Sequence, residues 1–179
     1  YTSPDMVNWT YRGGVLPDSV PGTLWIPNVI FDKTTSRFIM WFGAGGWGSA
    51  VSTDGIHFTL GSRFESRFGP KAGTDGTGLF IDDDGQGYVV FASSPPGIDE
   101  GPGTWPGHPH ALGSGHLVSI ERMSADLMTS TKINVSGFFP DDYVESPSLF
   151  KRKGVYYVTY GSCCCGCREG GGIVVFTSK

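Results

Sequence analysis

One stretch of sequence decides the fold: Val144-Glu145-Ser146-Pro147-Ser148-Leu149-Phe150, followed by Lys151-Arg152-Lys153-Gly154 and then by Val155-Tyr156-Tyr157-Val158-Thr159-Tyr160. The first part is typical of a strand, the second of a charged turn that a glycine closes, and the third of a strand rich in β-branched and aromatic residues. Together they predict a β-hairpin, with Glu145 standing just before its first strand.

The same arrangement occurs twice more, earlier in the chain. The stretch 24–30 precedes a turn at 32–36, and the stretch 74–80 precedes a turn at 82–85; an apolar run follows each turn. Aligning the ends of the three stretches at Ile30, Phe80 and Phe150 places three residues at one repeat position: Trp25, Asp75 and Glu145. Two of these three equivalent positions therefore carry a carboxylate.

A second repeated motif is the tripeptide Ser-x-Asp, which begins at Ser3, Ser52 and Ser124, while Ser178 stands where a fourth copy would begin. The serines are 49, 72 and 54 residues apart, and the longest interval contains an insertion at 94–115 that is rich in Gly, Pro and His. Without the insertion the period is about 50 residues, which is typical of a repeat architecture. Because Ser and Asp side chains bond nearby backbone groups and fix tight turns, we expect the three aspartates to be structural: Asp5, Asp54 and Asp126.

Each repeat has room for about four short strands and shows no helical periodicity. The pattern therefore predicts an all-β fold, a β-propeller in which each repeat forms one blade. The innermost strand of each blade lines the central channel, so Trp25, Asp75 and Glu145 would face one cavity. Two carboxyl groups and an aromatic ring suit a sugar, because the acids supply the chemistry and the ring a flat stacking face. The alternative is that these are ordinary loop residues.

The bulk composition suits many short strands joined by tight turns. The chain has 179 residues and a formal net charge of −4, with 28 glycines, 13% aromatic residues and only 17% charged residues. This length predicts one domain. No basic patch is present, so we expect no nucleic acid partner. No apolar run approaches the ~20 residues that span a bilayer, so we expect no membrane partner.

All four cysteines lie in one cluster: Cys163, Cys164, Cys165 and Cys167. Disulfides are the favoured interpretation, some of them to parts of a longer chain. A zinc site is the alternative, although its ligands usually stand two to four residues apart. The sequons Asn8-Trp9-Thr10 and Asn134-Val135-Ser136 agree with secretion. We expect a secreted protein without a metal ion or a cofactor.

Two further segments allow more than one interpretation. The run Asp82 to Gly85 predicts a hairpin turn; a calcium site is the alternative, although the acids do not alternate as they do in a calcium loop. The insertion at 94–115 holds Trp105, His108 and His110. It either rims the pocket and sets substrate choice or is a surface loop without a role.

These residues resemble glycoside hydrolase family 43, whose members are five-bladed β-propeller glycosidases. The resemblance covers nearly the whole chain and rests on three motifs: Ser3-Pro4-Asp5-Met6-Val7-Asn8-Trp9, Asp75 with the run 79–85, and the run 145–150 with its hairpin. The family usually has Gly where Ser146 stands and Pro where Gly76 stands. Trp25-x-Pro27 and the cysteine cluster resemble the subgroup of exo-acting β-1,3-galactanases.

The resemblance implies roles for the matched residues. Glu145 would be the general acid, and Asp75 the carboxylate that orients it and raises its pKa, because two close carboxyl groups cannot both ionise cheaply. Trp25 and Trp105 would contact the substrate. Family members invert the anomeric centre with a third carboxylate as base, roughly 6.5–9.5 Å from the acid. That base would lie upstream of Tyr1 and is not assigned, since Trp25 offers no carboxylate.

The leading hypothesis is a secreted glycosidase that cleaves plant or algal polysaccharides of the galactan, arabinan or xylan class. The alternatives are a non-catalytic carbohydrate-binding β-propeller, because the base is not visible, and a propeller used for protein interaction. We expect blade boundaries near 20, 70 and 140. Residues 1–179 would then be a fragment of a single catalytic domain, present as a partial set of blades and inactive on its own.

Overall fold

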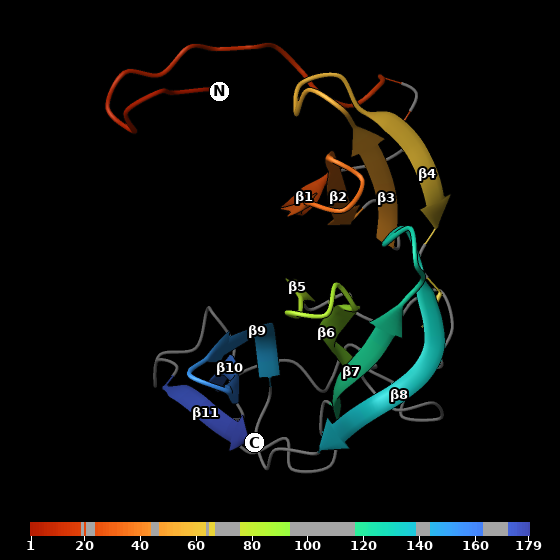
Figure 1. Cartoon of the computed structure of the whole chain (residues 1–179), viewed down its shortest axis with the longest axis vertical. Coiled ribbons are helices and arrows are strands. Elements are labelled where there is room, and N and C mark those ends of the chain that lie inside the picture. Colours follow the sequence, from red (N-terminus) through yellow and green to blue (C-terminus); the bar gives the residue numbers. More distant parts are fainter. Residues whose placement is uncertain are drawn as a thin grey trace, which may run out of the picture.

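The computed structural model describes residues 1–18, 20, 24–43, 47–63, 65–66, 76–93, 117–138, 144–162 and 172–179. Every regular element in these ranges is a β-strand, and the all-β prediction is confirmed (Figure 1). The strands are β1 Trp25–Asp32, β2 Arg37–Gly43, β3 Trp47–Ser52, β4 Thr59–Arg63, β5 Thr77–Ile81, β6 Gly87–Ser93, β7 Leu117–Met123, β8 Ser130–Phe138, β9 Val144–Arg152, β10 Val155–Ser162 and β11 Ile173–Ser178.

The strands form three antiparallel sheets, each from consecutive segments of the chain. Sheet 1 has the order β1-β2-β3-β4, sheet 2 the order β5-β6-β7-β8, and sheet 3 the order β9-β10-β11. Each of the three repeated stretches supplies the first strand of a sheet. The sheets follow one another along an arc, with β1, β5 and β9 on its inner side (Figure 1). Contacts between β1 and β5, and between β5 and β9, join these inner strands.

The predicted hairpins are confirmed. Arg152 pairs with Val155, which leaves Lys153 and Gly154 as a two-residue loop with φ values of 51° and 76°. Positive φ at both central residues is the condition for a type I′ turn, whose twist matches that of the flanking strands. At the β5–β6 turn, the Gly85 N–H donates to the Asp82 carbonyl at 2.9 Å, and Gly85 has a φ of 85°.

The Ser-x-Asp turns are confirmed as structural devices. In each, the serine hydroxyl donates to the aspartate Oδ1, at 3.0 Å for Ser3–Asp5, 2.8 Å for Ser52–Asp54 and 2.5 Å for Ser124–Asp126. The same oxygen accepts the backbone N–H two residues further on, from Val7, Ile56 and Met128. The residue after each aspartate has a positive φ: Met6, Gly55 and Leu127. The carboxylate therefore holds a tight turn in which the next residue has a positive φ, a conformation that few residues other than glycine favour.

Sheet 2 is buried on both faces, since alternate residues of β6 point in opposite directions. Val89 and Phe91 pack toward sheet 1, in a cluster completed by Ile39, Trp41, Trp47, Met123, Leu127 and Met128. Val90 and Ala92 pack toward sheet 3, in a cluster completed by Val118, Ile120, Leu149, Val158 and Tyr160. All four of these β6 side chains are fully buried. Burial of one large apolar side chain contributes about 1.5–3 kcal/mol, so the two clusters hold the sheets face to face.

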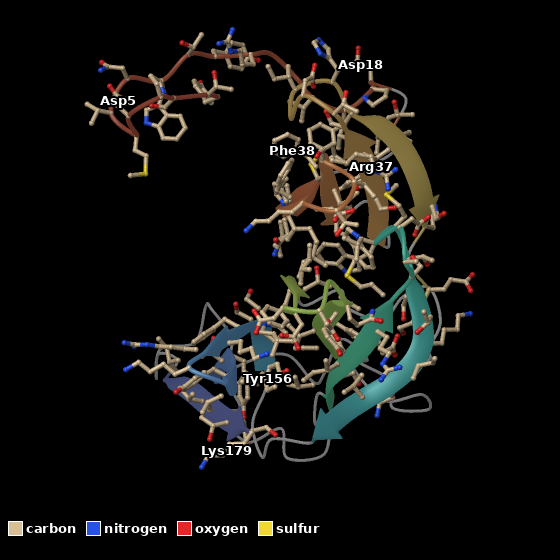
Figure 2. The ribbon with its side chains drawn as sticks, in the orientation of Figure 1. Asp5, Asp18, Arg37, Phe38, Tyr156 and Lys179 are labelled. Atoms are coloured by element: carbon tan, nitrogen blue, oxygen red, sulfur yellow. The ribbon has the colours of Figure 1, made fainter. Side chains whose placement is uncertain are left out.

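A polar network closes the interface between sheets 2 and 3 at the β5–β6 turn. The Lys151 ammonium lies 2.8 Å from Asp82 Oδ1 and 2.8 Å from Asp83 Oδ2. The Tyr156 hydroxyl donates to Asp82 Oδ2 at 2.6 Å. Figure 2 shows Tyr156 on sheet 3, and its ring packs edge-on against Phe80 of sheet 2. Both carboxylate oxygens of Asp82 are thus engaged by the neighbouring sheet.

This network lowers the pKa of Asp82. Burial alone would raise this pKa, but the hydrogen bonds from Lys151, Tyr156 and the Asp83 N–H outweigh burial and hold it below its ordinary value. The Asp82 side chain is only 9% exposed, whereas that of Asp83 is 87% exposed. A carboxylate with a lowered folded-state pKa stabilises the fold above its unfolded pKa of about 3.9 and loses this contribution as the pH falls through the folded-state value.

We predict that Asp82→Asn lowers the midpoint of urea unfolding at pH 7. Below about pH 4 the unfolding free energy of the variant should fall less than that of the unsubstituted protein. The amide cannot accept the charged hydrogen bond from Lys151. Asp83→Asn is the matched control and should have a smaller effect, because exposed ion pairs contribute little. Equal effects of the two substitutions would contradict the role of the network.

Candidate active site

The structure describes the backbone at two of the predicted site positions. Trp25 begins β1, and Glu145 is the second residue of β9, where it pairs with Gly161. The expectation that Glu145 stands before the strand is therefore wrong, because strand pairing extends one residue further than the apolar pattern indicated. Asp75, Trp105, His108, His110 and the four cysteines lie outside the described residues. The roles assigned to these side chains stay predictions.

A β-bulge occurs at the same repeat position in sheets 1 and 3. In sheet 1, Trp25 pairs with Gly43 and Asn28 with Trp41, so three steps along β1 match two along β2. In sheet 3, the pairs Glu145–Gly161 and Ser148–Thr159 show the same mismatch. Bulges bend a strand and redirect its side chains, and they are frequent beside active sites. The structure thus makes Trp25 and Glu145 equivalent, as the sequence alignment does.

The residue after each predicted site position has a positive φ. The values are 46° at Ile26, 113° at Gly76 and 49° at Ser146. Positive φ is rare for a residue other than glycine, and for a β-branched residue such as Ile26 it is an outlier. The left-handed conformation costs roughly 1–2 kcal/mol per residue for an L-amino acid. Backbone strain of this kind is concentrated at functional sites. A positive φ recurs here at one position of three successive repeats, with strain at Ile26 and Ser146 but not at Gly76.

The inner strands β5 and β9 touch through their backbones near the second and third of these positions. A Cβ atom added to Gly76 would lie 2.7 Å from the Cα of Ser146 and 2.9 Å from its backbone nitrogen. Since consecutive Cα atoms are about 3.8 Å apart, Asp75 and Glu145 are each one residue away from this contact. The fold therefore brings Gly76 and Ser146, the residues that follow the two predicted carboxylate positions in sequence, into backbone contact from segments 70 residues apart.

On its other side, β5 contacts β1. The Asn28 side-chain amide donates to the Thr77 carbonyl at 3.4 Å. Thr77 is only 4% exposed, and its hydroxyl is the one buried side-chain polar atom of the described residues that has no hydrogen-bond partner. The sequence analysis did not single out Thr77 or Asn28. The Gly-x-Gly pattern at 76–78 could have indicated that this segment lies close to its neighbours, because glycines in a strand often mark close backbone approach.

A cavity of about 510 Å³ lies between sheets 2 and 3, away from these positions. Its walls come from strands of both sheets and from the end of the chain, and they include Phe80, Tyr156 and Lys179. Figure 2 shows Tyr156 and Lys179 on this side of the molecule. Within the described ranges, no group of three or more His, Cys, Asp or Glu residues gathers as a metal site.

Known proteins share this chain's sequence pattern and fold. A curated β-D-galactofuranosidase from Aspergillus niger is 27% identical over 89% of the chain and 46% of its own length. An endo-1,4-β-xylanase structure from Bacteroides thetaiotaomicron matches with a TM-score of 0.69 and 25% identity, over 98% of the chain and 58% of its own. An exo-β-1,3-galactanase structure from Clostridium thermocellum matches with a TM-score of 0.68 and 22% identity, over 91% of the chain and 36% of its own length. No protein-family model matches the chain.

A structure from a capybara gut metagenome, named as a member of glycoside hydrolase family 43 (GH43_12), matches 98% of the chain with a TM-score of 0.71 at 20% identity, and the match covers 34% of that protein. The predicted resemblance to glycoside hydrolase family 43 is confirmed. The chain has the fold of these glycoside hydrolases. It spans less than two thirds of the length of each of the four proteins that it matches here.

We predict that Thr77→Val raises the unfolding free energy by about 1 kcal/mol, because it removes a buried hydroxyl that has no partner and keeps the shape of the side chain. The measurement is urea unfolding followed by fluorescence. Ser49→Ala is the contrasting control, since the Ser49 hydroxyl donates to the Met128 carbonyl at 2.8 Å and its loss should destabilise. A loss of stability in Thr77→Val would mean that the hydroxyl has a bound partner.

Proposed function

We propose that this chain is part of a five-bladed β-propeller glycosidase of glycoside hydrolase family 43. The radial order of the three sheets supports the propeller: each sheet presents its first strand to the inner side, and β1, β5 and β9 contact one another in sequence. A ring closed by further sheets would cover the outward faces at both ends of the arc. Exposed apolar residues on these faces, such as Val29 and Phe31 on β1 and Val175 on β11, agree with such a ring.

One observation carries the enzymatic proposal, namely the contact of Gly76 with Ser146. It supports a site in which Asp75 and Glu145, the residues that precede these two in sequence, stand near each other. Two close carboxyl groups resist ionising together, so one of them keeps its proton near neutral pH. Glu145 is then the general acid that protonates the departing sugar oxygen, and Asp75 is the carboxylate that orients it and raises its pKa.

Inversion requires a third carboxylate as the general base, about 6.5–9.5 Å from the acid, with a water molecule between them and the sugar. The equivalent position in sheet 1 is Trp25, which has no carboxylate. We therefore propose that a different repeat of the propeller supplies the base. We propose Trp25 and Trp105 as the aromatic residues that contact the sugar.

We propose β-linked galactans as the substrate class, with arabinans and xylans as the next candidates. The structures with this fold include exo-β-1,3-galactanases, one of them from Phanerochaete chrysosporium with bound β-1,3-galactotriose, as well as a xylanase. Polymers of this kind lie outside cells, which agrees with a secreted protein. A non-catalytic sugar-binding propeller is the second candidate, because Trp25 replaces a carboxylate at one repeat position. Release of galactose from β-1,3-galactan by the protein that contains this chain would support the glycosidase and exclude the non-catalytic propeller.

We predict that Glu145→Gln in that protein lowers the hydrolysis of natural glycans by about 10²–10⁴-fold, because an amide cannot donate the proton that the leaving oxygen needs. Aryl glycosides with activated leaving groups should lose less. The surface variant Glu65→Gln is the control and should keep its activity, since Glu65 pairs with Lys132 on an exposed edge. Equal losses on both classes of substrate would argue against an acid role for Glu145.

We predict that Asp75→Asn moves the basic limb of the pH–rate profile to lower pH. The negative neighbour keeps Glu145 protonated, so its removal lowers the pKa of Glu145. The measurement is kcat/KM against pH on galactan oligosaccharides. Asp84→Asn, in the exposed turn at the far end of β5, should leave the limb in place. If Asp75→Asn keeps its activity and the basic limb does not move, Asp75 is a structural residue and does not set the pKa of Glu145.

A further inference from the structure

We propose that Ser146 is a sugar-binding residue, whose hydroxyl forms a hydrogen bond with a hydroxyl group of the glycan. This inference rests on the proposed glycosidase function and deepens it, because it names a contact to the substrate at the same site. The backbone conformation, the position, the exposure and the hydrogen bonding of Ser146 support it.

Ser146 has a backbone conformation that glycine would adopt at no cost. Its φ is 49°, in the left-handed region, which is unfavourable for an L-amino acid with a Cβ atom and freely accessible to glycine. The residue lies in the bulge of β9, between the pairs Glu145–Gly161 and Ser148–Thr159. Because glycine would serve the backbone better, the reason for a serine must lie in its side chain. Strain of this kind is concentrated at functional sites.

The Ser146 hydroxyl lies where the inner strands β5 and β9 meet. Its Oγ is 3.2 Å from the position that a Cβ atom at Gly76 would take. Ser146 directly follows Glu145 in the chain, as Gly76 directly follows Asp75. The hydroxyl is therefore at the contact between the two segments that carry the predicted carboxylates, and a sugar bound at that contact would meet it.

Ser146 is exposed to solvent, whereas Pro147 and Leu149 of the same strand are buried. Within the part of the chain that the structure describes, the Ser146 hydroxyl has no hydrogen-bond partner. The Ser49 hydroxyl, by contrast, donates to the Met128 carbonyl at 2.8 Å and joins two sheets. A hydroxyl group offers one donor and two acceptor sites, so that of Ser146 is available to a hydroxyl group of a sugar.

The direction of the side chain separates Ser146 from the outward face of sheet 3. Leu149 packs against sheet 2, so Phe150, the next residue, points to the opposite, outward face. The Ser146 Oγ points instead toward Gly76 of the neighbouring segment. A further sheet packed on Phe150 would therefore not lie on the side to which this hydroxyl points.

The test is Ser146→Ala in the protein that contains this chain. Alanine keeps the Cβ atom and the strained backbone and removes only the hydroxyl. We expect KM for β-1,3-galactotriose to rise roughly 3–10-fold, as for the loss of one neutral hydrogen bond, with kcat little changed. The Kd that calorimetry measures in a Glu145→Gln background should rise by the same factor. The midpoint of urea unfolding should stay the same, because the hydroxyl has no partner in the described fold.

Ser146→Gly is the second variant, which separates the strain from the binding. It removes the hydroxyl and also the Cβ atom, so the midpoint of urea unfolding should be equal or higher while binding weakens as in Ser146→Ala. Lys153→Gly is the matched control, since Lys153 has a φ of 51° in the β9–β10 turn. Ser62→Ala, at an exposed serine of the outer strand β4, is the control for the loss of a hydroxyl. Both controls should leave KM and Kd unchanged.

The outcomes distinguish this contact from the proposed glycosidase function. If the protein binds galactotriose without cleaving it, and Ser146→Ala weakens this binding, the contact stands and the glycosidase fails. If the protein cleaves galactotriose and Ser146→Ala leaves KM and Kd unchanged, the contact is overturned and the glycosidase stands. A lower kcat at unchanged KM also overturns the contact, because the hydroxyl would then act on the catalytic groups. A protein that binds neither galactotriose, arabinotriose nor xylotriose overturns both.

Discussion

The burial of sheet 2 on both of its faces is the constraint on which the rest of the structure depends. Its central strand β6 sends Val89 and Phe91 into one apolar cluster and Val90 and Ala92 into the other. Neither cluster is complete without a neighbouring sheet, so the sheets must stack face to face. Once they do, the twist of each sheet turns the stack along an arc, and the first strands of the three sheets meet on its inner side.

The inner strands then share features that packing alone does not require. The same bulge occurs in β1 and β9, and a positive φ occurs at Ile26, Gly76 and Ser146. Strained backbone persists only where the surrounding structure holds it, and here the flanking strand pairs and the buried sheet faces do so. The positive φ lies one residue after each position at which the sequence predicts the acid, its partner carboxylate and an aromatic contact to the substrate. The rigid part of each sheet thus supports the part of the molecule that would meet a sugar.

Local signals in the sequence predicted much of this architecture. The loop Lys153-Gly154 and the Ser-x-Asp tripeptides fix their turns through atoms a few residues apart, so these turns can be predicted without knowledge of the fold. The continuous apolar run of β6 is also a local pattern. By contrast, the position of Glu145 within β9 depends on pairing with Gly161, and the network of Asp82, Lys151 and Tyr156 joins segments about 70 residues apart. Such pairings leave no local pattern, since any exposed Lys and Asp can form them.

The sequence by itself determined the repeat, the strands and turns of each unit, and the equivalence of Trp25, Asp75 and Glu145, because these follow from residue types at fixed spacing. Only the tertiary structure decided which segments meet on the inner side of the arc. The backbone at Gly76 lies against Ser146 of the next sheet, where a Cβ atom would have no space. A glycine in sequence has many uses. The packed sheets decide that this one permits the contact of two backbones, because the space for a Cβ atom is filled by another strand.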